Sequence, residues 1–119
     1  MNYQANFLAA LAFAIVVETA VAFLVLKKIF RIATLGPWPI AYAGLMSNCS
    51  SLPYVWFVLP ALIRNYTAYV IVSEICVVLW EALFYYLYLR IDRKQATLLS
   101  LLANGASWLL GFPFLHLLA

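Results

Sequence analysis

Apolar and polar positions divide the chain into four long apolar segments joined by short polar links. The segments are Phe7–Leu26, Pro39–Ile63, Thr67–Leu89 and Ala96–Leu118. Each reaches the length of about 20 residues that an α-helix needs to cross the hydrocarbon core of a bilayer. Lipid offers no hydrogen-bond partners to an open sheet, so only helices or closed barrels can span it. We therefore predict an all-α integral membrane protein, a bundle of four transmembrane helices.

Composition supports a membrane class. The chain has 119 residues, of which 68% are hydrophobic and 9% charged, whereas a soluble domain is about 25% charged. The four segments leave no room for a soluble domain, so residues 1–119 are predicted to form a single transmembrane domain in the lipid bilayer. We expect a prokaryotic inner membrane as its location.

Lysine and arginine are distributed unequally between the links. Six bases follow the first and third segments, and one lies on the other side. They are Lys27, Lys28, Arg31, Arg90, Arg93 and Lys94 against Arg64. Because basic links stay in the cytoplasm, we predict that both termini are external. The net charge of +3 then reflects topology and anionic headgroups, and without a basic face no nucleic-acid partner is expected.

A two-helix pattern occurs twice along the chain. The first segment ends ETAVAFLVLK from Glu18, and the third ends EALFYYLYLR from Glu81. The second and fourth contain NCSS from Asn48 and NGAS from Asn104, each followed by a proline, Pro53 or Pro113. Two helices return the chain to its starting side. We therefore predict an internal parallel repeat whose pseudo-twofold axis runs along the membrane normal.

The four polar residues of this repeat are expected at one depth. Glu18 and Glu81 each precede the last leucine of their segment by eight residues, roughly 12 Å at 1.5 Å per residue. Asn48 lies nine residues after Pro39 and Asn104 eight residues after Ala96, which gives them a similar depth in the returning segments. The supporting polar residues are Ser51, Ser107 and Ser100. Glu74 precedes Glu81 by two helix turns on the same face and is therefore expected nearer the external side.

Acids at this depth need a chemical explanation. An ionised carboxylate there costs at least ~2.5–3.5 kcal/mol, and every lysine and arginine lies at a segment end. The acids can stay protonated, bind a cation or line a wet cavity. Pro53 and Pro113 lack an N–H and leave a carbonyl of the preceding turn without its helical hydrogen bond. These backbone oxygens, with carboxylate, amide and hydroxyl oxygens, suit Na⁺, Ca²⁺ or Mg²⁺ better than zinc or copper. We expect an ion- or proton-binding site of Glu18, Glu81, Asn48 and Asn104, with Glu74 on the outer access path and no cofactor.

Two functions follow from this pattern. The first is an oligomeric cation- or proton-coupled transporter or channel, because four helices rarely enclose a pathway alone. The alternative is a non-catalytic accessory or assembly subunit of a larger membrane complex, in which the polar groups hold helices together at about 0.6 kcal/mol per contact. A polar layer facing inward would favour transport, and one facing outward would favour the subunit. No nucleophile–base arrangement is present, so no enzyme is expected.

Overall fold

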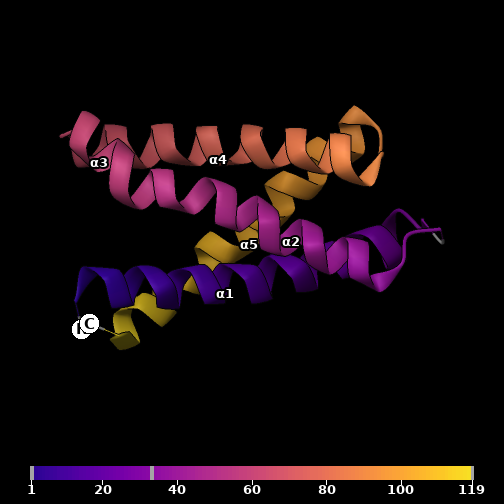
Figure 1. The fold of residues 1–119 in the computed structure, drawn as a ribbon, viewed down its shortest axis with the longest axis horizontal. Helices are drawn as coiled ribbons and strands as arrows, with labels where there is room; N and C mark the ends of the chain where they lie inside the picture. The colour runs from indigo at the N-terminus through magenta and orange to yellow at the C-terminus, as the bar shows by residue number, and fades with distance from the viewer. Residues whose placement is uncertain (1, 33, 119) are drawn as a thin grey trace.

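The computed structural model describes residues 2–32 and 34–118, and it describes side chains as far as residue 111. Its elements are α1 (Tyr3–Leu24), η1 (Val25–Ile29), α2 (Pro37–Pro53), η2 (Tyr54–Val58), α3 (Leu59–Leu62), α4 (Tyr66–Leu89) and α5 (Arg93–Leu118). The elements η1 and η2 are π-helical turns that continue α1 and α2, so the chain forms four long helices (Figure 1). No strand occurs in the described ranges, and the prediction of an all-α protein is confirmed.

Polar side chains mark where the helices begin. The Oδ1 atom of Asn2 accepts a hydrogen bond from the first turn of α1 at 2.7 Å, and Asn65 does the same for α4 at 3.0 Å. Asp92 and Gln95 satisfy each other's backbone amides at the start of α5, a capping box. Pro37 opens α2, where its missing N–H costs nothing.

Two arginines in the left-handed conformation end the first and third helices. Arg31 has φ of 55° and Arg90 has φ of 57°. Beyond Arg31, the amide of Ile32 donates to the carbonyl of Leu26, six residues earlier, at 2.9 Å. Both helices therefore stop with a sharp turn at the same end of the molecule (Figure 1).

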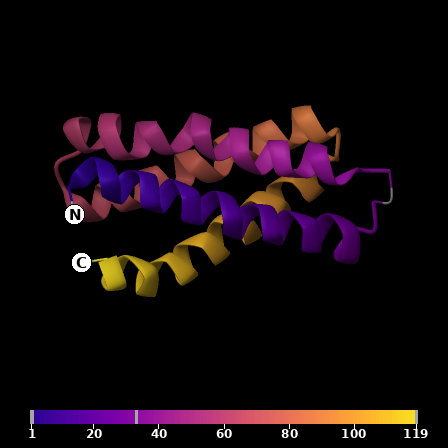
Figure 2. The same ribbon diagram turned by 60° about the horizontal axis from the view of Figure 1, so that its bottom comes forward.

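The four long helices form a closed ring of neighbours. The helices α1 and α4 run in the same direction. From the end of α1, α2 crosses to α4, and from the end of α4, α5 crosses back to α1 (Figures 1 and 2). We call the end where both termini lie the terminal end, and the opposite end, with Arg31 and Arg90, the basic end. The molecule is 42 Å along its longest axis.

Buried positions follow a similar spacing in both halves of the chain. In α1 and α4, one residue in four faces the interior, with Glu18 and Glu81 at the same place in each series. The two series are Ala14, Glu18, Ala22, Leu26 and Val77, Glu81, Tyr85, Leu89. In α2 and α5 they are Ile40, Ala43, Gly44, Ser47, Asn48 and Ala96, Leu99, Ser100, Ala103, Asn104.

Much of the outer surface is apolar. Two helices, Tyr3–Ile29 and Tyr66–Leu89, are long and apolar enough to span a membrane, and only 22% and 28% of their most apolar stretches are buried. A core helix of a soluble protein would be mostly buried. Large apolar side chains instead point outward, among them Leu8, Val16, Leu24, Leu79, Leu83 and Leu87. These two helices favour a membrane location.

The helix boundaries differ from the predicted segments. The first helix starts at Tyr3 and continues to Ile29, and the fourth starts at Arg93. The second is interrupted after Pro53 by η2, where proline has no N–H to donate to the preceding turn. The side chain of Pro113, the other proline named in the predicted repeat, lies outside the described residues.

Candidate functional polar layer

Four polar residues meet in the interior of the bundle. Glu18, Glu81, Asn48 and Asn104 have exposed fractions of 2%, 0%, 1% and 7%, and we call them the polar layer. They come one from each long helix. All four face the inside of a single chain rather than its outer surface, which is the inward orientation that the transport hypothesis requires.

Both asparagine side chains are held by their own helices. The Nδ2 atom of Asn48 donates to the carbonyl of Gly44 at 2.7 Å. The Nδ2 atom of Asn104 donates to the carbonyl of Ser100 at 2.9 Å, one turn back in the same way. The amide nitrogens are thereby used within the helix. The Oδ1 atom of Asn48 is buried and has no hydrogen-bond partner among the described residues, so it is available as an acceptor.

The glutamates lie together but are not satisfied. The carboxyl of Glu81 lies near the carboxyl of Glu18, the side-chain amide of Asn104 and the hydroxyls of Ser47 and Tyr85. None of these groups meets the distance and angle of a hydrogen bond to the Glu81 carboxyl. Both Glu81 oxygens and Oε1 of Glu18 are buried without a partner in the described part of the chain. An unsatisfied buried carboxyl costs at least about 1–3 kcal/mol, so this pair has a strong need for a proton or a cation.

The acids do not form a multi-ligand metal centre. Within residues 2–32 and 34–111, no three His, Cys, Asp or Glu side chains are close enough to hold one metal ion. The layer offers two adjacent carboxyls, neutral amide and hydroxyl oxygens, and no base. Such a set can share a proton or hold a single cation between Glu18 and Glu81.

A cavity of about 290 Å³ lies on one side of the polar layer. It is bounded by α1, the end of α2, η2, α4 and α5, and extends from Tyr66 near the terminal end to Glu18 and Asn104. Glu74, which is half-buried, and Ser107 also line it. The other side of the layer is closed by apolar packing around Leu26, Ile40, Tyr85, Leu89 and Leu99. The layer is thus approached from the terminal end and sealed from the basic end.

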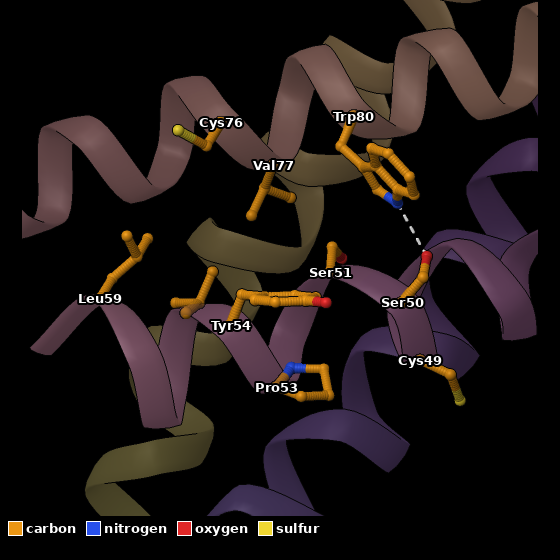
Figure 3. Close-up of a pocket in the computed structure, with 10 residues that line it drawn as sticks. Cys49, Ser50, Ser51, Pro53, Tyr54, Leu59, Cys76, Val77 and Trp80 are labelled. Atoms are coloured by element: carbon orange, nitrogen blue, oxygen red, sulfur yellow. Dashed lines mark hydrogen bonds between the residues drawn. The ribbon is translucent and has the colours of Figure 1, made fainter.

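A second, larger hollow of about 660 Å³ lies between α2, η2 and α4 (Figure 3). The indole nitrogen of Trp80 donates to the hydroxyl of Ser50 at 2.7 Å across it. Cys49 and Cys76, both exposed and free, stand beside it, and most of its lining is apolar. It holds no carboxyl group, so it is distinct from the polar layer.

The supporting serines take different places. Ser100 donates to the carbonyl of Val78 at 2.7 Å and links α5 to α4. Ser51 is buried, and its hydroxyl donates to the backbone carbonyl of Ser47 in the same helix at 2.8 Å. Ser107 alone of the three lines the cavity.

Sequence reasoning missed several residues of this region. Tyr85 and Ser73 each have a buried hydroxyl without a partner in the described chain, and Ser47 is fully buried beside Glu81. Two signals could have identified them. Tyr85 lies one turn after Glu81, and Ser47 directly precedes Asn48.

No protein-family model, curated protein or solved structure matches this chain. Its function must be inferred from the polar layer and the cavity beside it.

Proposed function

We propose that this chain is a four-span membrane protein that couples protons or cations to transport through the polar layer. The observation that carries the proposal is the inward-facing pair of buried carboxyls with unsatisfied oxygens, Glu18 and Glu81, of which Glu18 also lines a cavity. Intramembrane acids of this kind mark ion pathways and proton relays. The prokaryotic inner membrane and a homo-oligomeric assembly belong to the same proposal.

The dimensions and charges of the bundle support four spans. Its long axis of 42 Å corresponds to the ~40–45 Å of a bilayer with its headgroups. Six bases follow α1 and α4 at the basic end, and Arg64 alone follows α3 at the terminal end. The positive-inside rule then orients the basic end toward the cytoplasm, with the cavity opening outside.

The arrangement of the helices supports the two-helix repeat. Each unit pairs a helix that ends in a left-handed arginine with a returning helix whose asparagine bonds one turn back. In Figure 1, α2 crosses in front from the end of α1 toward α4, and α5 crosses behind from the end of α4 back toward α1. We infer that Glu18 corresponds to Glu81, and Asn48 to Asn104.

The unequal access to the polar layer supports transport. A transporter alternates between states in which one side of its site is open and the other is closed. Here the cavity reaches Glu18 and Asn104 from the terminal end, while Tyr85 and Leu26 close the basic end. We assign this arrangement to the outward-facing state.

One observation favours the rival, an accessory subunit. The apolar hollow between α2 and α4 (Figure 3) could receive a helix from another membrane protein. The polar layer itself would make no contact with such a partner helix, because its side chains are buried inside the chain.

Flux through liposomes tests the proposal. Wild-type protein should move H⁺ or Na⁺ down an imposed gradient. Glu81→Gln should remain folded, with thermal stability in detergent unchanged or higher, because glutamine keeps the shape and removes the proton. Its flux should disappear. Asp92→Asn removes a carboxyl at the basic end, keeps the helix cap, and should leave flux unchanged.

The proposal fails under a defined result. Wild-type liposomes would show no flux of H⁺, Na⁺, Mg²⁺ or Ca²⁺, and Glu81→Gln would behave identically. Stable co-purification of a second membrane polypeptide in that case would favour the subunit function.

A further inference from the structure

We propose that the cavity of about 290 Å³ beside the polar layer binds a small organic cation, an amine or ammonium with an apolar body. This inference rests on the proposed function, for which it names the substrate class. The cavity combines aromatic walls, carboxyls at its floor and side, and a lining free of basic side chains across the described residues.

Aromatic rings form much of the wall. They come from three helices and from η2, and are Phe13, Trp56, Tyr66, Tyr69 and Trp108. A cation over such a ring gains ~0.5–2 kcal/mol, with the larger values in sites from which water is excluded. Neutral apolar ligands would also contact these rings, so the aromatic walls indicate a ligand with an apolar body without fixing its charge.

Two of these rings are held in place. The indole of Trp56 packs against Tyr3 at a centroid distance of 5.1 Å and against Phe7 at 5.7 Å. The hydroxyl of Tyr69 donates to the carbonyl of Val55 in η2. A wall fixed before the ligand arrives loses little conformational freedom on binding.

The carboxyls determine the sign of the ligand. Glu18 is 2% exposed, its Oε1 atom has no hydrogen-bond partner in the described chain, and it borders the cavity. Glu74 borders the same cavity and is half-buried. An anion would be repelled by both, and a neutral ligand without donors would leave the Glu18 oxygen unsatisfied. A cation satisfies it.

Hydroxyl groups can orient the cationic head. Ser73 and Ser107 both line the cavity. The Oγ atom of Ser73 is buried without a partner in the described ranges, so it can accept an N–H bond from an amine. Pockets for drug-sized ligands measure about 300–1,000 Å³, and a cavity of about 290 Å³ therefore admits only a small one.

Calorimetry on the full chain in nanodiscs tests the inference, with N,N-dimethylbenzylamine as the probe, because at neutral pH it is a cation that keeps an N–H donor. Binding should be saturable. The neutral alcohol 2-methyl-1-phenyl-2-propanol, similar in shape, should bind about tenfold more weakly because it cannot replace the cation at the carboxyls and rings.

Matched variants assign the binding to the cavity. Glu74→Gln and Trp56→Leu should each weaken binding by about fivefold to tenfold, whereas Trp56→Phe should keep most of it. Asp92→Asn, which removes a carboxyl outside the cavity, should bind like wild type. Equal affinity for the cation and the alcohol, or affinity unchanged by both Glu74→Gln and Trp56→Leu, would overturn the inference.

The two proposals fail separately. Flux that depends on Glu81, without cation binding, defeats the substrate class and leaves ion transport standing. Cation binding that depends on Glu74, in liposomes without any flux, supports the site and defeats transport.

Discussion

Gly44 permits the close approach of α1 and α2 next to the polar layer. A Cβ atom at this position would lie 3.2 Å from Cβ of Thr19 and 3.4 Å from its Cα, and would overlap the threonine hydroxyl. Small residues allow membrane helices to approach in this way. Because Asn48 lies one turn further along α2 and donates to the Gly44 carbonyl, this contact also sets the position of the asparagine beside α1.

We predict that Gly44→Ala destabilises the bundle. The added methyl must push α1 and α2 apart, at a cost of about 1–3 kcal/mol. Thermal unfolding in detergent measures the change.

The matched control is Gly105→Ala. A Cβ atom there meets nothing within 4 Å, so alanine should be neutral or should stabilise the helix by up to ~1 kcal/mol. If both variants unfold at the same temperature, the close contact between Gly44 and Thr19 is not present in solution.

The sequence predicted a common depth for the polar layer, but neither the direction in which its side chains face nor the residues that they contact. A helix rises by a fixed amount per residue, so sequence position alone put Glu18, Glu81, Asn48 and Asn104 at one depth. The four are buried in the interior of the chain. Which other side chains meet them depends on helix rotation and crossing, which is why Tyr85 was missed.

At the scale of elements, the π-helical turn η2 explains why one wall of the cavity was not predicted. Trp56 belongs to η2, which follows Pro53. Patterns for helix faces assume 3.6 residues per turn, and a π turn changes the direction of every side chain beyond it. The prolines predicted a disturbed helix, but not that the disturbance would place an indole against the cavity.

The capping box of α5 provides a test at this scale. Asp92→Ala removes the acceptor for the Gln95 amide, now at 2.8 Å, and should cost about 0.5–2 kcal/mol. Asp92→Asn keeps an acceptor and should cost little. Hydrogen exchange of the first turn of α5 should accelerate in the alanine variant alone. Equal exchange in both variants would show that the cap does not hold the helix start.

For the whole molecule, the prediction concerns orientation. Reporter domains fused to either terminus should be external, and reporters placed after Leu26 or Leu89 should be cytoplasmic, because the basic end holds six of the seven bases. Protease accessibility in intact cells is the measurement. An N-terminus on the cytoplasmic side would contradict the charge argument and would reverse the side on which the cavity opens.

The positions of the two chain ends have a consequence for how the protein can be encoded. The start of α1 and the end of α5 lie near each other at the terminal end (Figures 1 and 2). At the same end, the three residues from Ile63 to Asn65 join α3 to α4. Suppose that a peptide links the old termini and that the chain is opened between α3 and α4. The long helices would then follow in the order α4, α5, α1, α2, with α3 at the new end. The same four helices would keep their neighbours, so the gene could be circularly permuted at its middle and still specify this bundle.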